Sequence, residues 1–268
     1  MIKKVVPTLF LHGFNGSGDT FNGVFNGRWT PGEDLNKDIA FTDIITVGSL
    51  EYNDDHPYVK VWSNFNESQI TAKTSENPFI QVIFLQNVHT FNQQVNWLKE
   101  SIKRLQSEYN FDTINIVSHS MGGLIGTKYI EDTYRSIDFP RVDKLITLDS
   151  PINGAVVANY IKYSSTATKD LSIRSNAIEQ IYLNKDSFDP RTKVVSYASI
   201  DSDLGVDIVS LESALSLENI AQGPVTRVVT PYSHSGKTEI VNPEIMNDVA
   251  NYLWGDSEIK NQVLIFPE

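Results

Sequence analysis

The sequence predicts an α/β fold in which a mainly parallel sheet is covered by helices on both faces. Short apolar runs rich in β-branched residues alternate with longer segments of helical period, and one such run leads through a sharp turn directly into a helix. Parallel strands require crossover connections, and the helices in these connections bury both faces of the sheet. No repeat, low-complexity tract or linker divides the chain, so we expect a single domain over residues 1–268.

The expected strands are short apolar runs bounded by polar or glycine-rich turns. In chain order they cover residues 5–11, 44–47, 59–62, 79–85, 113–117, 142–148, 194–198 and 225–229, and the run at 225–229 is interpreted as the last strand. The second and third runs flank an Asn-Asp-Asp-His-Pro stretch, which favours a hairpin or strand pair.

Helices are expected at residues 90–109, from the turn after residue 117 to about residue 134, and at 243–254. The first has an apolar face with spacings of three and four, made by Phe91, Val95, Leu98, Ile102 and Leu105. Residues 153–189 form a polar, helix-prone stretch between two strands. We expect this stretch to be a short polar cap segment within the domain.

Composition excludes several classes of function. The net charge of −11 and the scattered basic residues argue against a nucleic-acid partner, because phosphate backbones are bound by clusters of Lys and Arg. The absence of cysteine excludes disulfides, thiol nucleophiles and thiolate metal sites. We expect no metal and no other cofactor, since no metal-ligating cluster or phosphate-binding glycine loop is visible. No run is long enough for a transmembrane segment.

Residues 118–122, Ser-His-Ser-Met-Gly, match the G-x-S-x-G nucleophile elbow except that serine replaces the first glycine. An elbow holds its nucleophile in a strained turn between strand and helix, so the flanking positions must be small, and serine is small. A β-branched strand precedes the motif and a helix follows it. The sequence therefore predicts Ser120 as a nucleophile.

A serine hydroxyl needs a base to take its proton, and histidine is suited to that role near neutral pH. In hydrolases with a nucleophile elbow, the catalytic residues follow the chain order nucleophile, acid, histidine. His234 is the only one of the five histidines that lies beyond Ser120. His234 is therefore the predicted base. His119 lies inside the elbow and is expected to point away from the site, whereas His56 and His89 are interpreted as surface or packing residues.

The acid that orients the base has several candidates. Asp207 is preferred, because it lies in a loop after the strand at 194–198 and precedes a short apolar pair and a serine. Asp201 and Asp203 stand in the same loop. Asp149 is a further alternative, since some lipases carry the acid after the strand that directly follows the nucleophile helix.

An oxyanion formed during acyl transfer needs preorganised N–H donors. Met121, which follows the nucleophile at a helix N-terminus, is expected to supply one. The loop after the first strand, His12-Gly13-Phe14, is placed to supply a second through the Phe14 N–H, and Gly13 allows a close turn.

Several motifs together resemble a family of α/β-hydrolases found in Gram-positive bacteria and usually described as candidate cell-surface hydrolases, lipase-like or esterase-like. The motifs are His12-Gly13-Phe14, the elbow through Gly123, Leu148-Asp149-Ser150-Pro151, His234-Ser235, Asn242-Pro243 and Leu253-Trp254. Family members often carry a second histidine in a His-Ser-x-Leu-His-Glu-Asn pattern. This chain has Lys-Thr-Glu-Ile at 237–240 instead, so at this point the resemblance rests on His234 alone. The resemblance covers nearly the whole chain and implies the α/β-hydrolase fold and a carboxylic ester hydrolase.

The expected activity is hydrolysis of a small-molecule ester through an acyl-enzyme. The stretch at 153–189 lacks the strongly apolar amphipathic lid of interfacial enzymes, so short-chain or soluble acyl esters are favoured. An amidase or peptidase, an acyltransferase, and a non-catalytic binding protein with this fold are the alternatives. The resemblance implies an extracellular or cell-surface location, and a chain that never carried a leader would be cytoplasmic. The sequence does not indicate an oligomeric state.

Overall fold

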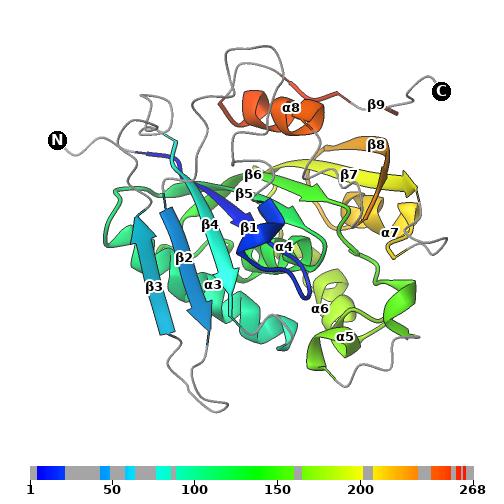
Figure 1. Ribbon diagram of the computed structural model, residues 1–268, viewed down its shortest axis with the longest axis horizontal. Helices are drawn as coiled ribbons and strands as arrows, with labels where there is room; N and C mark the ends of the chain where they lie inside the picture. Colours follow the sequence, from blue (N-terminus) through cyan, green and yellow to red (C-terminus); the bar gives the residue numbers. More distant parts are fainter. Residues whose placement is uncertain are drawn as a thin grey trace.

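The computed structural model describes residues 5–21, 43–48, 58–63, 77–85, 89–159, 165–201, 208–234, 243–254, 258–260 and 262–263. Its centre is a nine-stranded sheet with the strand order β3-β2-β4-β1-β5-β6-β7-β8-β9 (Figure 1). Every neighbouring pair is parallel except β2 and β3, which are antiparallel. This is the α/β-hydrolase fold predicted from the sequence.

The strands coincide with the apolar runs of the sequence. They are β1 (Thr8–Leu11), β2 (Asp43–Gly48), β3 (Tyr58–Ser63), β4 (Phe79–Phe84), β5 (Thr113–His119), β6 (Arg141–Leu148), β7 (Lys193–Asp201), β8 (Val225–Ser233) and β9 (Gln262–Val263). The strand pair expected around residues 53–57 is confirmed, because β2 and β3 are hydrogen-bonded neighbours. The expectation that the strand at 225–229 is the last one is wrong, because the two-residue β9 adds to the sheet edge beside β8.

The α-helices are α3 (Phe91–Gln106), α4 (Met121–Thr133), α5 (Thr166–Asp170), α6 (Asn176–Leu183), α7 (Leu211–Leu215) and α8 (Pro243–Trp254). Short 3-10 turns are η1 (Gly18–Phe21), η3 (Val156–Asn159), η4 (Lys185–Ser187) and η5 (Ser216–Asn219). Side-chain oxygens of Thr90, Ser165, Ser175 and Ser210 cap α3, α5, α6 and α7 by accepting a hydrogen bond from a backbone N–H in the first turn.

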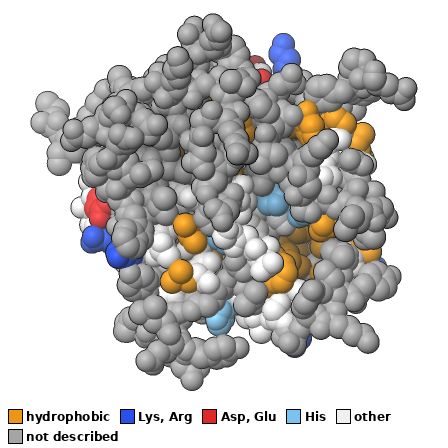
Figure 2. All heavy atoms as spheres, in the orientation of Figure 1, with side chains coloured by type: hydrophobic (Ala, Val, Ile, Leu, Met, Phe, Trp, Pro, Cys, Tyr) orange, Lys and Arg blue, Asp and Glu red, His pale blue; other side chains and the backbone are white. Residues whose placement is uncertain are grey.

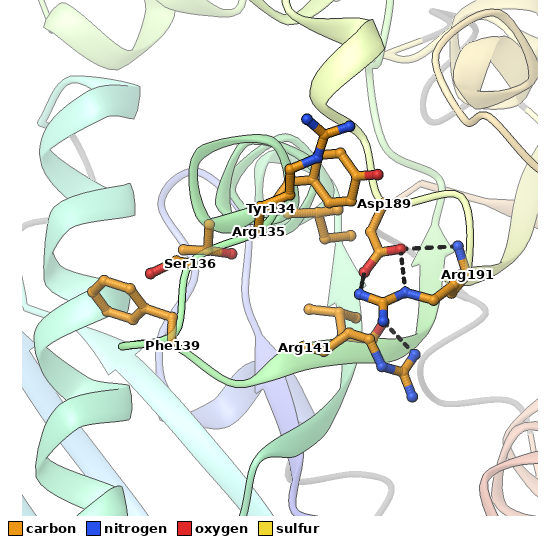
Figure 3. Close-up of a pocket in the computed structure, with 10 residues that line it drawn as sticks. Tyr134, Arg135, Ser136, Phe139, Arg141, Asp189 and Arg191 are labelled. Atoms are coloured by element: carbon orange, nitrogen blue, oxygen red, sulfur yellow. Dashed lines mark hydrogen bonds and ion pairs between the residues drawn. The ribbon is translucent and has the colours of Figure 1, made fainter.

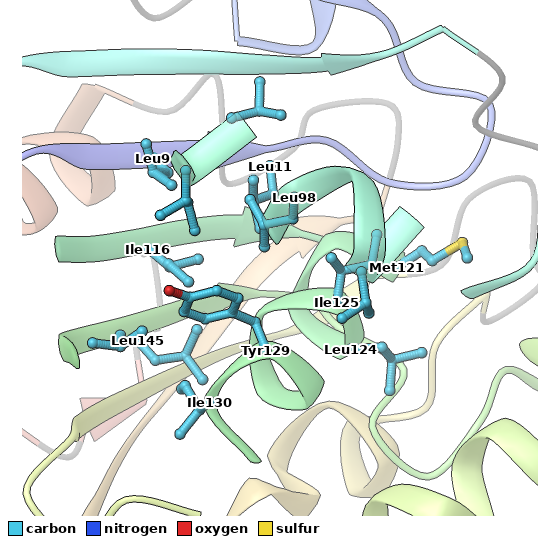
Figure 4. Packing of buried hydrophobic residues seen from close by; sticks show 14 of the residues in the cluster. Leu9, Leu11, Leu98, Ile116, Met121, Leu124, Ile125, Tyr129, Ile130 and Leu145 are labelled. Atoms are coloured by element: carbon cyan, nitrogen blue, oxygen red, sulfur yellow. The ribbon is translucent and has the colours of Figure 1, made fainter. Parts of the chain in front are cut away.

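Two apolar cores lie on opposite faces of the sheet. On one face, α3, α4 and α6 cover β1, β4, β5 and β6, and Figure 4 shows Tyr129 of α4 packed towards Ile116 and Leu145 of the sheet. On the other face α8 and η1 pack on the alternate side chains of the same strands. This alternation is why the strands read as nearly continuous apolar runs.

The expected cap segment at 153–189 contains η3, α5, α6 and η4, and in Figure 1 α5 and α6 lie together at one side of the molecule. Its status as part of a single domain stays a prediction. Among the described helices none is long and apolar enough to cross a membrane.

Candidate active site

A cavity of about 270 Å³ lies where the carboxyl ends of the central parallel strands meet. Ser120 follows β5 and His234 follows β8, and both line this cavity together with Phe14 of the loop after β1. In open α/β sheets this edge is where ligands bind. The structure therefore brings together the serine, the histidine and the β1 loop that the sequence singled out.

Ser120 occupies a sharp turn between β5 and α4. Its backbone has φ 53° and ψ −127°, a conformation that L-residues rarely adopt, and its N–H donates to the Leu148 carbonyl at 3.0 Å. The side chain makes no capping hydrogen bond to α4 and lies against the cavity, although Ser120 as a whole is only 8 % exposed. The turn thus presents the hydroxyl to the cavity instead of to its own helix.

Three glycines allow the elbow to close. A Cβ on Gly13 would lie 2.6 Å from Ser120 Cβ, one on Gly122 would lie 2.4 Å from the Leu11 carbonyl oxygen, and one on Gly123 would lie 2.1 Å from Ser150 Oγ. The β1 loop, the elbow and the loop after β6 therefore touch through glycine backbones. This close approach is the structural reason for the small residues that the sequence motif requires.

Asp149, at the end of β6, is the acid that contacts the imidazole. Its Oδ2 lies 2.6 Å from His234 Nδ1, and its Oδ1 accepts a hydrogen bond from the Ser199 N–H at 3.1 Å. Asp149 is only 2 % exposed and has φ 49°, so a strained turn holds a buried carboxylate with both oxygens paired. A carboxylate only accepts, so His234 Nδ1 carries a proton, and in the neutral imidazole the lone pair is on Nε2.

The preferred acid of the sequence analysis, Asp207, lies outside the described residues, as does Asp203. For Asp201 the structure describes only the backbone, which pairs with Ser233 in the sheet. The Nδ1 position of His234 is occupied by Asp149, the alternative. The physical reason is strand order: β6 lies beside β5, and the Asp149 N–H donates to the Tyr197 carbonyl at 3.0 Å, which turns the carboxylate towards the end of β8.

His119 differs from its expectation, because its ring does not point away from the site. The ring lines the cavity, lies 4.9 Å from the His234 ring centroid to centroid, and its Nε2–H donates to the His234 carbonyl at 3.1 Å. Burial, with a further contribution from the nearby His234, lowers the pKa of His119 to about 3. His119 is therefore neutral at physiological pH, and sequence reasoning missed its contact because the elbow motif leaves this position unspecified.

The β1 loop is held in place by His12. The Phe84 N–H donates to His12 Nε2 at 3.0 Å, so the proton is on Nδ1, which donates to the Gly13 carbonyl at 2.9 Å. The Gly16 N–H donates to the same carbonyl at 3.1 Å. Burial lowers the pKa of His12, which keeps this ring neutral.

Of the two residues expected to supply oxyanion donors, Met121 directly follows the serine and Phe14 lines the same cavity. Met121 is the first residue of α4, so its N–H has no carbonyl partner within the helix. Phe14 lines the cavity next to Ser120.

Two histidines were interpreted as surface or packing residues. His89 contacts Trp97 edge to face at 5.4 Å between ring centroids, and His56 lies outside the described residues.

A second cavity lies at the opposite edge of the sheet and contains three arginines (Figure 3). Arg191 pairs with Asp189 at 2.7 Å, and Arg141 pairs with Asp143 at 3.0 Å. The guanidinium of Arg135 lies over the Tyr134 ring at 4.8 Å. Each of these three guanidinium groups thus has a partner within the protein.

Within the described ranges no group of three or more His, Asp or Glu side chains could hold a metal ion.

Comparison with known families matches residues 1–256 to the model described as "Alpha/beta hydrolase of unknown function (DUF915)". The chain belongs to this family. Membership makes it a hydrolase-family protein of unspecified substrate and agrees with the resemblance found in the sequence. No curated protein matches the sequence.

Solved structures share the fold of this DUF915 member over nearly its whole length. The product of gene lin2722 from Listeria innocua is 18 % identical with a TM-score of 0.68, covering 97 % of this chain and 98 % of that one. A candidate cell surface hydrolase from Lactobacillus plantarum WCFS1 is 19 % identical with a TM-score of 0.66, covering 96 % and 94 %. Phospholipase PlaB from Legionella pneumophila is 11 % identical with a TM-score of 0.56, covering 93 % and 58 %.

Proposed function

We propose that this α/β-hydrolase cleaves carboxylic esters of short or soluble acyl groups through a Ser120–His234–Asp149 triad. The observation that carries the proposal is the 2.6 Å contact between His234 Nδ1 and Asp149 Oδ2 in a cavity that also contains Ser120. The contact leaves the Nε2 lone pair of His234 available to the serine, which is the protonation state that a general base requires. Asp149 thereby takes the role that the sequence analysis gave first to Asp207.

In the proposed mechanism Ser120 Oγ attacks the ester carbonyl while His234 Nε2 takes the hydroxyl proton. The negative charge of the tetrahedral intermediate is stabilised by the N–H groups of Met121 and Phe14. The imidazolium, held by Asp149, then returns the proton to the leaving alkoxide, and the alcohol departs. Water, deprotonated by His234, attacks the acyl-enzyme, and Ser120 regains the proton as the acid is released.

The proposal favours esters of modest size for two reasons. The cavity volume of about 270 Å³ is slightly below the roughly 300–1,000 Å³ of sites that take drug-sized ligands. In addition, the helices α5 and α6 of the cap segment are short, at five and eight residues. An amidase would use the same three groups, so the leaving group must be tested directly.

The test is a panel of chromogenic esters and matched anilides of the same acids. We expect the esters to be cleaved through an acyl-enzyme, and with activated esters, for which acylation is faster than deacylation, an initial burst of chromophore close to the enzyme concentration. Ser120→Ala should lose roughly 10⁶-fold in kcat. Ser101→Ala is the matched control, since Ser101 is a fully buried serine of α3 whose hydroxyl donates to the Trp97 carbonyl.

Faster cleavage of the anilides would replace the esterase by an amidase on the same triad. Transfer of the acyl group to an added alcohol in preference to water would indicate an acyltransferase. Ester cleavage that survives Ser120→Ala would overturn the proposed nucleophile, and a folded protein with no activity on any of these substrates would favour the non-catalytic binding protein.

A further inference from the structure

The cavity beside Ser120 has an apolar wall. Its described lining includes Ala155, Ala158, Leu171 and Val209, and no Asp, Glu, Lys or Arg is among the described lining residues. In Figure 2, hydrophobic side chains gather next to histidine atoms in the middle of the face viewed. The wall therefore suits an uncharged hydrocarbon group and offers no partner for a charged one.

Hydrogen bonds within the protein hold this wall in place. The Ala155 N–H donates to the Leu171 carbonyl at 2.8 Å, which ties the start of η3 to the end of α5. Asp170 Oδ2 accepts from the Phe91 N–H at 2.7 Å and fixes α5 to α3. The Asn153 N–H donates to Ser213 Oγ, which in turn donates to the Gly154 carbonyl, and these bonds fix the cap segment to α7. The pocket is thus preformed.

We infer that this apolar pocket binds the acyl chain of the ester, and that Ala158 and Leu171 set the longest chain it accepts. The inference rests on the proposed function and specifies its substrate. The acyl part is the better occupant, because it stays bound to Ser120 through both half-reactions while the alcohol must leave and be replaced by water. An apolar wall that grips the acyl chain therefore acts on both steps.

The size of the pocket gives the chain length. At roughly 30 Å³ for each water-sized group, 270 Å³ accommodates about nine methylene-sized groups. The ester carbon and its oxygen take part of this space, so straight acyl chains up to about eight carbons should fit. Each buried methylene should raise kcat/KM by roughly fourfold until the pocket is full.

The experiment compares two series of esters, chromogenic esters that differ in the acyl chain and alkyl acetates that differ in the alcohol. One series varies the acyl chain from two to twelve carbons with a fixed alcohol, and the other varies the alcohol over the same lengths with a fixed acetyl group. For the wild type we expect kcat/KM to rise along the acyl series to about eight carbons and then fall. The alcohol series should change much less.

Two substitutions should shift this limit in opposite directions. Ala158→Phe fills the pocket, so the octanoate-to-acetate ratio of kcat/KM should fall about tenfold or more. Leu171→Ala enlarges the pocket and should move the optimum to longer chains. Urea unfolding of each variant is the folding control, and Leu183→Phe, at an 80 % exposed position of α6 outside the pocket, should leave the ratio unchanged.

An unchanged ratio in both Ala158→Phe and Leu171→Ala, or a shift in the alcohol series instead of the acyl series, would overturn the inference. Binding of octanoate, measured by calorimetry, separates this failure from failure of the proposed function. Octanoate should bind the wild type about tenfold more tightly than Ala158→Phe. If no ester is cleaved but this difference in binding remains, the proposed reaction is wrong and the pocket assignment stands. Equal binding by both proteins would contradict the pocket.

Discussion

His234 is fixed by two neighbours that act on different parts of the residue. Asp149 holds the ring through Nδ1, and His119 holds the backbone by donating to the His234 carbonyl. Both neighbours are buried or lie in the cavity wall, so little solvent competes for these hydrogen bonds. The orientation of His234 therefore depends on residues at the ends of β5, β6 and β8. Asp149 and His119 contact different parts of His234, so we expect their substitutions to have different effects.

Asp149→Asn should lower kcat by roughly 10⁴-fold, because an amide no longer enforces the Nδ1–H form of His234 or stabilises its cation. Kinetics on a short-chain ester measure this effect. Asp189→Asn is the matched control, since Asp189 is also buried but pairs with Arg191 at the opposite edge of the sheet. A larger loss in Asp207→Asn than in Asp149→Asn would contradict the proposed triad.

His119→Phe should lower kcat about tenfold with little change in KM, because a ring remains beside His234 but the N–H donor is lost. His119→Gln keeps an N–H donor and should recover most of the rate. The pKa of His119 lies at about 3, so this residue is neutral from about pH 5 upwards. The pH profile of kcat/KM above pH 5 should therefore be the same in His119→Gln as in the wild type. A changed profile, or no recovery of the rate in His119→Gln, would refute this role of His119.

At the scale of the elements, the sequence predicted the scaffold well and its edges less well. The apolar runs became β1 to β8, because a strand buried on both faces leaves a continuous apolar pattern. Short elements were missed: α7, for example, has five residues and β9 has two, which is too few for any period to be visible. Short elements are defined by the tertiary contacts around them.

The difference between local sequence patterns and tertiary contacts also explains how much of the candidate site could be predicted. That Ser120 and His234 lie at one cavity could be predicted, because the elbow has a local pattern and only one histidine follows it. That Asp149 contacts His234 could not be predicted, since Asp149 and Asp207 both follow strands whose carboxyl ends reach the same sheet edge. The hydrogen bond from the Ser199 N–H, which helps to aim the Asp149 carboxylate, comes from a residue fifty positions away and leaves no local signal.

The junction of β1 and α4 gives a prediction at this scale. Replacing a helical glycine by alanine normally stabilises a helix, but a Cβ on Gly122 would lie 2.4 Å from the Leu11 carbonyl oxygen. Gly122→Ala should therefore destabilise the protein by about 1–3 kcal/mol in urea unfolding and reduce activity, because the β1 loop must move away from Ser120.

Gly126→Ala, one turn further along α4, is the control for this substitution. The atoms nearest to its added Cβ are methyl groups of Ile116 and Leu145 at 3.2 Å, which can shift slightly. Its effect on stability should be clearly smaller than that of Gly122→Ala. Equal effects of the two substitutions would mean that the backbone contact with β1 is unimportant.

The whole molecule carries a net charge of −11, and among the described residues one carboxyl group is buried without a hydrogen-bond partner. Glu131 of α4 is 5 % exposed, and neither of its carboxyl oxygens has a hydrogen-bond partner among the described residues. The neighbouring Lys128 is bound to Asp132. Burial raises the pKa of Glu131 from 4.5 to about 8, so the folded protein holds a proton that the unfolded chain loses.

This buried carboxyl group should make the stability of the protein depend on pH. The contribution of the bound proton is complete below about pH 4.5 and is lost as the pH rises through about 8, so the free energy of unfolding should decrease over that range. Glu131→Gln should remove this dependence and stabilise the protein at pH 9 relative to the wild type. Urea unfolding from pH 5 to 9 measures both effects, and parallel curves for the two proteins would contradict a neutral Glu131.

The central claim is that Ser120 is a nucleophile activated by His234 and Asp149. The most direct measurement is the rate of covalent labelling by a fluorophosphonate, with the modified residue located by peptide mass spectrometry. We predict stoichiometric labelling at Ser120, no labelling of Ser120→Ala, and a large decrease in rate for His234→Ala and Asp149→Asn, with Asp189→Asn labelled at the wild-type rate. Folded wild-type protein that stays unlabelled, or that is labelled at another serine, would contradict the account.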